Sequence, residues 1–414
     1  MTAPPPPNAL AYCAWAFGSL FFFYAFVQRV APSVMVEDLM RDFAVGGAIV
    51  GNLSAFYFYA YAGLQIPIGV MMDRVGPRRL MSAAALLCGA GGVLFATSAA
   101  VEGAYLGRLL VGAGVGFSWV GTLTVIAQWF PARRFALLTG FTQLAGMAGG
   151  VYGQAPLAAS VSEFGWRTTM TVVAVAALAL AVALWSVVRD RPHVASRGTS
   201  LLAGLASVAR QRETWFNAFF GMSMTGPMLA FAGLWGVPYL VAKFGLDRSA
   251  AGATTSLMFI GWGIGAPTLG WFSDTIRRRK SVMLACGAGA VTTFLCVLYV
   301  PGLPLGPLKA LLLVHGFFAS GMVLSFAAAR EHNAPAASGA ALGLVNAAVV
   351  GSGALLQPLV GLLLDLQWDG ALVSGARIYT PRAYAWAFAV IPAIGLAGTA
   401  IALASRETYC RQQV

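Results

Sequence analysis

The chain has 414 residues, of which 59% are hydrophobic and only 10% are charged, and its formal net charge is +12. A soluble fold cannot hide so much apolar surface, so this composition excludes a soluble globular protein and predicts one embedded in a lipid bilayer. The basic residues lie in short loops between apolar runs and do not line one polar face, which argues against nucleic-acid binding despite the positive charge.

Twelve apolar segments, each long enough to cross a bilayer as a helix, can be recognised in the sequence. They are residues 9–36, 47–72, 80–100, 104–129, 136–158, 168–188, 214–241, 249–272, 281–300, 305–329, 338–364 and 383–404. An Arg-rich stretch at 189–213 separates the first six from the last six. We therefore predict an all-α, polytopic membrane protein with a six-helix bundle at 1–188, a cytoplasmic linker at 189–213 and a second bundle at 214–414.

A charged tight loop follows the second apolar run and reads Gly69-Val-Met-Met-Asp73-Arg74-Val-Gly76-Pro77-Arg78-Arg79. A similar loop half a chain later reads Gly270-Trp-Phe-Ser-Asp274-Thr-Ile-Arg277-Arg278-Arg279-Lys280, with its Gly and its Asp at the same spacing. Two copies in register predict a duplicated membrane unit whose halves are related by pseudo-symmetry.

These loops resemble a motif of the major facilitator superfamily, in which a Gly-x-x-x-Asp-Arg-x-Gly-Arg-Arg pattern joins helices 2 and 3 and recurs between helices 8 and 9. Pro77 and Arg277 depart from that pattern. The resemblance implies two bundles that work by alternating access. It also implies a gating role for one set of loop residues, with Asp73 approaching helix 11: Gly69, Asp73, Arg74, Arg78, Arg79, Asp274 and Arg278. The alternative is a plain positive-inside loop, which explains the Arg residues but not the two Asp residues.

Most of the 26 Lys and Arg residues fall in the loops on one side of the predicted membrane, the side that includes residues 73–79 and 274–280. Basic loops resist translocation, so this asymmetry predicts that both termini are cytoplasmic and that the protein lies in a bacterial-type inner membrane. We expect a monomer in contact with anionic lipids.

Arg29 is the first candidate for substrate binding because the apolar run around it continues to Val36. A guanidinium inside a span is costly and usually faces a cavity or a partner, where it can hold a carboxylate or phosphate bidentately. In the alternative interpretation, Arg29 reaches the membrane surface or pairs with Glu37 or Asp38.

Tyr57, Tyr61 and Gln65 recur at i, i+4 and i+8, which places them on one stripe of the second helix. With Tyr24 and Gln28 they could line a polar pathway beside Arg29. Across helices 1 and 2 the chain resembles the sugar-phosphate and organophosphate permeases, which carry a basic pair where Gln28-Arg29 stands and a Tyr and a Lys at Tyr61 and Gln65. Their second phosphate-binding Arg falls on Leu229. One of several cationic contacts therefore remains, which favours a monoanionic carboxylate or a zwitterion such as an amino acid over a doubly charged phosphate. The run from Gln28 to Met35 also resembles permeases of the phagosomal-transporter type.

The remaining polar positions within spans are candidates with weaker arguments. We expect Gln143, Trp235 and Asn346 to shape the substrate site, although interhelical hydrogen bonding is the alternative for each. Arg108 and Lys309 stand at corresponding positions of the two halves, and with His315 they are candidates for coupling to a proton or an exchanged anion. Lipid-interface placement is the alternative for the two cations. No Asp or Glu lies deep in a predicted span.

The sequence therefore predicts a secondary active or facilitative transporter for a small organic anion or zwitterion. The alternatives are an exporter of drugs or siderophores and a membrane sensor that binds a solute without moving it. No nucleophile–base pair or metal cluster is recognisable, and the five cysteines form no C-x-x-C pair. We therefore expect neither an enzyme nor a bound metal or cofactor.

Overall fold

The computed structural model describes residues 9–190 and 201–413, almost all of them in helices. Its contacts divide the chain into two compact units. Unit 1 contains residues 1–35 and 56–196, and unit 2 contains residues 36–55 and 197–414. Part of the expected linker at 189–213, residues 191–200, lies outside the described residues. The first half of the sequence therefore contributes one segment, 36–55, to the unit that holds the C-terminal helices.

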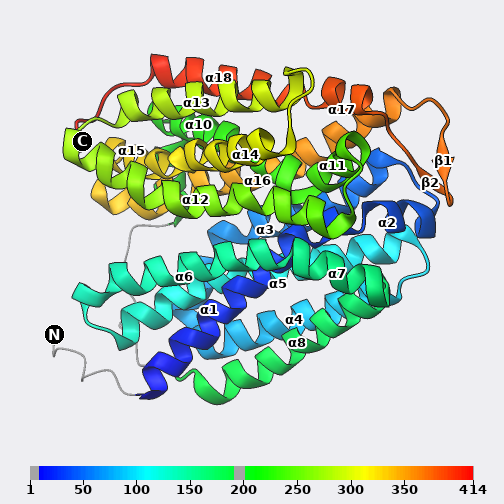
Figure 1. Cartoon of the computed structure of the whole chain (residues 1–414). Helices are drawn as coiled ribbons and strands as arrows, with labels where there is room; N and C mark the ends of the chain where they lie inside the picture. The colour runs from blue at the N-terminus through cyan, green and yellow to red at the C-terminus, as the bar shows by residue number, and fades with distance from the viewer. Residues whose placement is uncertain (1–8, 191–200, 414) are drawn as a thin grey trace. The chain divides into compact units, whose positions relative to one another are not determined.

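Unit 1 is built from long apolar helices (Figure 1). They are α1 (Ala9–Val30), the greater part of α3 (Gly47–Val75), α4 (Pro77–Thr97), α5 (Val101–Trp129), α6 (Ala132–Tyr152), α7 (Ala155–Phe164) and α8 (Trp166–Val187). A short 3-10 turn at Ala31–Val34 follows α1. Helix α4 packs between α5 and α8, while α1 packs against α5 and α6.

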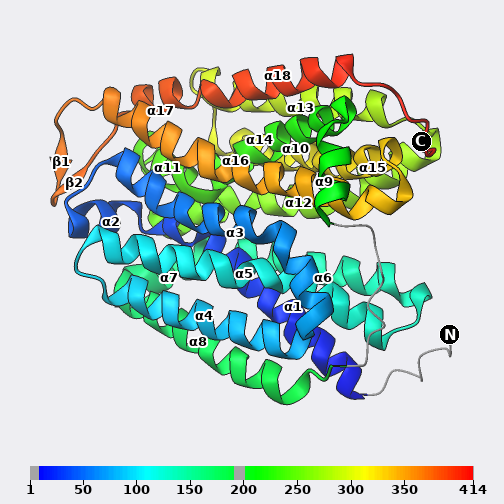
Figure 2. The ribbon, with the colours of Figure 1, turned by 180° about the vertical axis from the view of Figure 1, so that it is seen from behind.

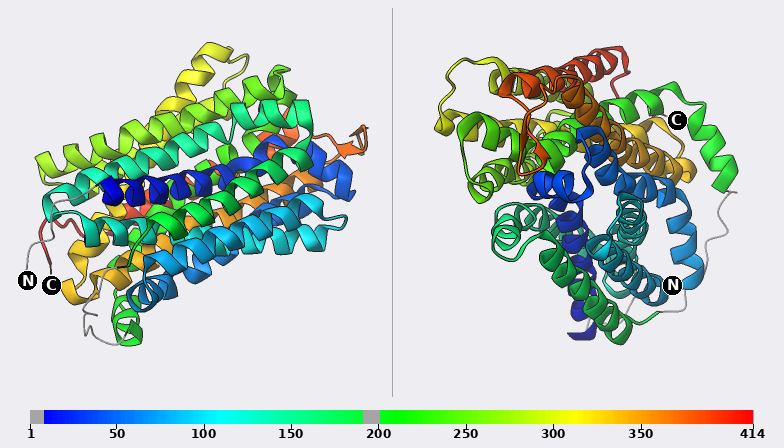
Figure 3. Two further views of the ribbon diagram at one scale, coloured as in Figure 1. Left: turned by 90° about the horizontal axis from the view of Figure 1, so that it is seen from below. Right: turned by 90° about the vertical axis from the view of Figure 1, so that its right-hand side faces the viewer.

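Unit 2 contains the amphipathic helix α2 (Val36–Phe43), the first turns of α3 and the C-terminal helices (Figure 2). The C-terminal elements are α9 (Leu201–Ala209), α10 (Arg212–Ala230), α11 (Gly236–Phe244), α12 (Arg248–Ile276), α13 (Arg279–Tyr299), α14 (Leu305–Ala319), α15 (Val323–His332), α16 (Ser338–Leu366), α17 (Pro381–Ala387) and α18 (Val390–Ala404). A hairpin of β1 (Leu372–Val373) and β2 (Ala376–Arg377) joins α16 to α17 and extends past the helix ends beside α2 (Figure 3).

Several predicted spans are interrupted in the structure, and local chemistry explains where. The span expected at 136–158 ends at Tyr152 and resumes as α7, because Gly153 and Pro156 favour a break there. The span expected at 214–241 contains a π-helical turn at Phe231–Trp235, one turn after Pro227. The last span is divided into α17 and α18.

Among the described residues, nine spans are long and apolar enough to cross a bilayer, or ten when the bent pair of α2 and α3 counts as one. Helices α6 and α12 have 21 and 29 residues, which is long enough, but they do not reach the same apolar character. The all-α polytopic architecture is confirmed, whereas the exact number of twelve spans is not.

Candidate functional site

The C-terminal end of α1 carries three polar side chains that are almost completely buried. Tyr24 and Gln28 lie one turn apart, and the Gln28 amide Nε2 donates a hydrogen bond of 2.7 Å to the Tyr24 hydroxyl. Arg29 is only 8% exposed, and its guanidinium carbon lies 4.2 Å from the ring centre of Phe26. Arg29 therefore points into protein instead of reaching the surface. Its other expected partner, Asp38, pairs with Arg248 at 2.6 Å.

Helix α3 presents the predicted stripe of tyrosines to this end of α1. The rings of Tyr57 and Tyr61 stack with their centres 6.1 Å apart, as expected for positions i and i+4. The Tyr57 hydroxyl donates to the Ala25 carbonyl at 2.9 Å, which fixes α3 against α1. The Arg29 guanidinium carbon lies 5.5 Å from the Tyr61 ring centre, and Arg29 interacts with both hydroxyls. Gln65, the third member of the stripe, interacts with Tyr61.

Helix α5 adds a second buried cation that the sequence analysis did not place at the substrate site. Arg108 is 1% exposed, and its Nη1 donates to the backbone carbonyl of Gln28 at 2.9 Å and approaches the Gln28 side-chain oxygen at 3.5 Å. Its guanidinium carbon lies 5.1 Å from the Tyr57 ring centre. Arg108 thus joins Arg29 in one group of residues, here named the arginine cluster: Tyr24, Gln28, Arg29, Tyr57, Tyr61 and Arg108.

A close approach of α3 and α5 makes this arrangement possible. A Cβ placed on Gly112 would lie 2.1 Å from the Tyr57 carbonyl oxygen, so only glycine fits at that crossing. The run Arg108-Leu-Leu-Val-Gly112 places Gly112 one turn after Arg108, on the same face of the helix. The same glycine-rich run that draws the two helices together therefore brings the Arg108 side chain beside Tyr57.

The two guanidinium groups of the arginine cluster have donor atoms that the surrounding helices do not satisfy. Among the described residues, the Nε atom of Arg29 and the Nε and Nη2 atoms of Arg108 are buried without a hydrogen-bond partner. No Asp or Glu occurs in α1, in α3 before Asp73, or in α5 after Glu102 in its first turn. Buried guanidinium groups normally have an anionic partner, because burial without one is costly. Their donors and charge are suited to a bound anion.

The other predicted substrate residues are each described within their own unit. Gln143 is half-buried in α6. Trp235 and Asn346 belong to unit 2; the Trp235 indole donates to the Gln357 carbonyl at 2.9 Å, and Asn346 is half-buried in α16. The structure therefore brings together the residues predicted from helices 1 and 2 and adds Arg108. The substrate roles of Gln143, Trp235 and Asn346 stay predictions.

The first charged loop has a clear anchor at Arg78. Its Nε donates to the Trp185 carbonyl at 2.9 Å, and its backbone N–H donates to the Asp190 carboxylate at 2.8 Å. Gly76 has φ of +91°, which allows the sharp turn into α4. Gly69 has open space around it, and Arg74 and Arg79 are exposed. The Asp73 side chain lies outside the described part of the chain, so its approach to helix 11 stays a prediction.

The second charged loop forms an ionic network around Arg279. This residue pairs with Asp274 at 2.7 Å and with Glu331 at 2.9 Å. Glu407 from the C-terminal tail accepts hydrogen bonds from the first backbone N–H groups of α13 and so caps that helix. Arg278, the predicted gating residue, instead lies over the Tyr409 ring at 5.7 Å. Sequence reasoning did not single out Arg279, because its partners Glu331 and Glu407 are distant in the chain.

The two other coupling candidates have different environments. His315 is buried in α14, and its Nδ1 lies 3.0 Å from the Ala290 carbonyl and 3.3 Å from the Thr293 hydroxyl. Lys309 is exposed at the start of the same helix. The lipid-interface alternative therefore suits Lys309 but not Arg108. A coupling role for any of the three residues stays a prediction.

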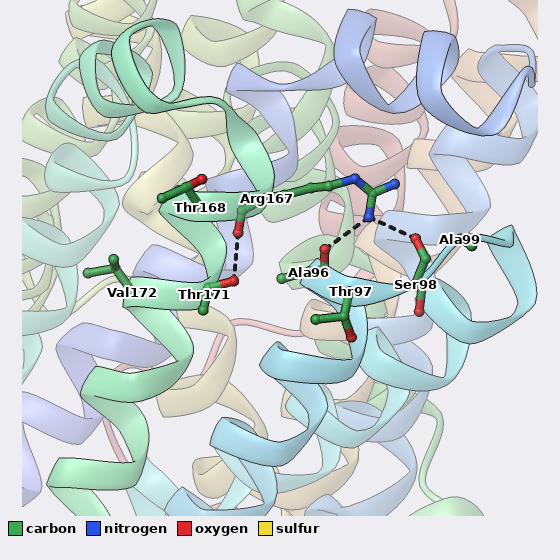
Figure 4. A pocket seen from close by; sticks show the side chains of 8 residues that line it. All are labelled: Ala96, Thr97, Ser98, Ala99, Arg167, Thr168, Thr171 and Val172. Carbon is green, nitrogen blue, oxygen red and sulfur yellow. Dashed lines mark hydrogen bonds between the residues drawn. The ribbon is translucent and has the colours of Figure 1, made fainter.

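A cavity of about 620 Å³ lies between the ends of α4 and α8 (Figure 4). The Arg167 guanidinium points across it and donates to the carbonyls of Ala96 and Ser98 at 2.9 and 2.8 Å. These carbonyls end α4 and lack helical partners, so Arg167 acts as a C-terminal cap. This groove is explained by helix capping and is not the candidate binding site.

The fold and the sequence both match known membrane transport proteins. The "Probable L-galactonate transporter" of Escherichia coli (strain K12) is 25% identical over 299 residues, which cover 64% of either chain. The "Probable nitrate/nitrite transporter NarK2" of Mycobacterium tuberculosis (strain CDC 1551 / Oshkosh) is 29% identical over 277 residues, or 63% of this chain and 66% of that protein. Each match thus spans less than two thirds of the relative's length.

Solved structures agree with this fold. A bacterial homologue of the human lysosomal transporter Spinster, in an inward-facing and occupied conformation, superimposes with a TM-score of 0.78 and 16% identity. The superposition covers 94% of this chain and 95% of that chain. The family model described as "Major Facilitator Superfamily" matches residues 17–237 and 215–409, nearly the whole length of the sequence. The chain is a multi-pass membrane protein that belongs to the Major Facilitator Superfamily.

Proposed function

We propose that this protein carries a small organic anion across the membrane by alternating access, and that the arginine cluster binds the anion. The observation that carries the proposal is the pair of buried guanidinium groups, Arg29 and Arg108, with unpartnered nitrogens and no carboxylate on the surrounding helix segments. An anion that accepts hydrogen bonds from these groups compensates a charge for which the surrounding helix segments supply no carboxylate.

The cluster favours an anion over a zwitterion. The ammonium group of an amino acid requires a carboxylate or several carbonyl acceptors, and α1, α3 and α5 supply no acidic side chain beside the cluster. The tyrosine and glutamine side chains offer hydroxyl and amide contacts to a polar substrate body. The printed names of two relatives, which refer to galactonate and to nitrate or nitrite, support an anionic substrate. A hydroxylated carboxylate fits these contacts best.

The same lack of acidic residues bears on energy coupling. Proton-driven carriers commonly use a carboxylate within a span, and none lies beside the arginine cluster. Exchange of one anion for another, or facilitated movement, needs no such group. We therefore propose anion exchange or facilitated transport, in an inner membrane and with both chain termini cytoplasmic.

The test is counterflow in proteoliposomes. Vesicles that contain the purified protein are preloaded with an unlabelled hydroxy acid, sugar acid, sulfonate, nitrate or amino acid, and entry of the labelled compound is followed. We expect counterflow with at least one carboxylate and its loss in Arg29→Ala. Counterflow restricted to amino acids would overturn the anion assignment. A ligand that raises the apparent melting temperature without any flux would instead indicate a sensor.

A further inference from the structure

The segment of residues 36–55 connects the two units covalently while packing entirely as part of unit 2. Helix α3 is continuous from Gly47 to Val75, yet its first turns belong to unit 2 and the remainder belongs to unit 1. The contacts that hold its first turns are therefore placed to control any movement of α3 relative to the C-terminal helices.

One of these contacts is made by Asp365, which lies one residue before the end of α16. Its carboxylate accepts hydrogen bonds from the backbone N–H of Gly47 at 3.0 Å and of Ala48 at 2.9 Å. The residues just before α3 are Ala44, Val45 and Gly46, none of which has a capping side chain. Asp365 therefore caps the N-terminus of α3 from another helix, where the helix dipole favours a negative charge.

Two further side chains complete the carboxylate site. The Arg377 guanidinium at the end of β2 forms a salt bridge with Asp365 at 3.0 Å, and the Tyr379 hydroxyl donates to the same carboxylate at 2.5 Å. Burial, together with the neighbouring Asp365 carboxylate, raises the pKa of Tyr379 above its ordinary value. The Tyr379 hydroxyl therefore stays protonated and remains a donor, so the carboxylate has four donors among the described residues.

Glycines allow the two helices to meet at this point. A Cβ on Gly51 would lie 2.5 Å from the Gln357 carbonyl, and a Cβ on Gly361 would lie 2.2 Å from the Gly47 carbonyl. The Trp235 ring fills the space beside Gly47 and Gly361, which explains its complete burial. The contact is a close-packed crossing that the sequence specifies at several positions, and not a chance encounter of surface charges.

A second ionic contact holds α2 to the same unit. Arg248, at the start of α12, bonds to Asp38 at 2.6 Å, and Arg41 reaches the same carboxylate at 3.1 Å. Arg248 and Asp274 lie at opposite ends of α12, so these contacts are at the end of unit 2 that is remote from the charged loop around Asp274. By the positive-inside prediction this end faces outward.

We propose that Asp365, Arg377 and Tyr379 form a releasable latch on the N-terminus of α3, and that Asp365 is the positioning residue that holds the first turns of α3 against α16. The proposal rests on the proposed transport function in one respect, since alternating access requires these turns to be released. The carboxylate can be released because its four donors are at the edge of the unit, where Asp365 and Arg377 retain 17% and 32% side-chain exposure and water can replace them.

Opening is measured directly, without any substrate, through Val50. This residue lies in the first turns of α3 and is completely buried in unit 2. In the full-length protein purified in detergent, the rate at which a maleimide labels Val50→Cys reports how often these turns leave unit 2. We expect Asp365→Ala to raise that rate at least tenfold, Tyr379→Phe to raise it two- to threefold, and Asp365→Glu to restore most of the protection.

Asp369→Ala is the matched control, because Asp369 is an exposed acid in the loop directly after α16 and accepts a hydrogen bond from the nearby Ala371 N–H at 3.1 Å. Its labelling rate is expected to stay at the level of the parent protein. Equal rates in Asp365→Ala and Asp369→Ala would overturn the latch. If Asp365→Ala does not fold, the comparison of Tyr379→Phe with Asp369→Ala decides. Failure of every compound to show counterflow would remove the proposed function and leave this labelling result standing.

Discussion

Arg108 and Lys309 stand at corresponding places in the duplicated sequence, each near the start of a long helix, but their side chains differ in burial. Arg108 is buried beside the Gln28 carbonyl and the Tyr57 ring, whereas Lys309 is exposed. The difference extends to other cations. In unit 2, Arg248, Arg279 and Arg377 each form salt bridges near helix ends. We propose that the buried cations Arg29 and Arg108 of unit 1 serve ligand binding, whereas Arg248, Arg279 and Arg377 of unit 2 serve structural pairing.

The largest effect is expected at Arg29. Arg29→Ala removes a buried charged donor, and loss of such a contact to an anion is worth about 3 kcal/mol, or roughly a 100-fold fall in uptake efficiency. Because no described residue forms a salt bridge with this guanidinium, the apparent melting temperature should stay constant or rise. Initial-rate uptake and thermal unfolding of the same preparation test both statements.

Arg29→Lys is the matched variant, since it keeps the charge but loses the forked donor geometry. We expect intermediate uptake from it. Equal uptake by the parent protein and Arg29→Ala would place the substrate elsewhere and remove the contrast between the units.

A smaller effect is expected at Arg108. Arg108→Gln keeps a donor near Gln28 but removes the second charge, so the KM for the anion should rise about tenfold, which corresponds to about 1.4 kcal/mol. Part of the Arg108 side chain is already bonded to the Gln28 carbonyl, which is why its loss should matter less than that of Arg29. If KM is unchanged while stability falls, Arg108 is a packing residue and the binding charge of unit 1 is Arg29 alone.

Much of the arginine cluster could be predicted because its determinants are local. Tyr57, Tyr61 and Gln65 repeat with the helical period, and Gln28 and Arg29 interrupt an apolar run, so helix geometry alone places them on defined faces. The burial of Arg108 was not predictable in the same way. It depends on Gly112 and on the approach of α3, and the sequence around Lys309 shows a similar cation at the start of an apolar run with the opposite outcome.

The carboxylate cap on α3 shows more clearly which contacts cannot be predicted from the sequence. Asp365 and Gly47 are 318 residues apart, and neither lies in a sequence motif that predicts the other as its partner. The bundle architecture and the helix order follow from apolar length, but contacts of this kind depend on which helix ends meet. The break in the span at Gly153 and the turn after Pro227 could be predicted in part, since the residue types indicate where a helix is interrupted but not the geometry of the interruption.

The corresponding test in unit 2 is Arg279→Gln. This change leaves Glu331 and Asp274 without their cation, and breaking a half-buried pair of this kind should lower the apparent melting temperature by several degrees. The KM for the anion should not change, because Arg279 is paired by the protein itself. A raised KM with unchanged stability would contradict the structural role assigned to the cations of unit 2.

The smallest effect is expected at Lys309, and it completes the comparison. Lys309→Ala removes the cation that corresponds to Arg108 in the sequence, but the side chain is exposed and we find no hydrogen bond or salt bridge for it among the described residues. Surface charges of this kind contribute about 0–1 kcal/mol, so uptake should stay within a factor of two of the parent protein, and the melting temperature within about 1 °C. A tenfold loss of uptake in Lys309→Ala would mean that the duplicated cations act as a pair. It would contradict the different roles proposed for the cations of the two units.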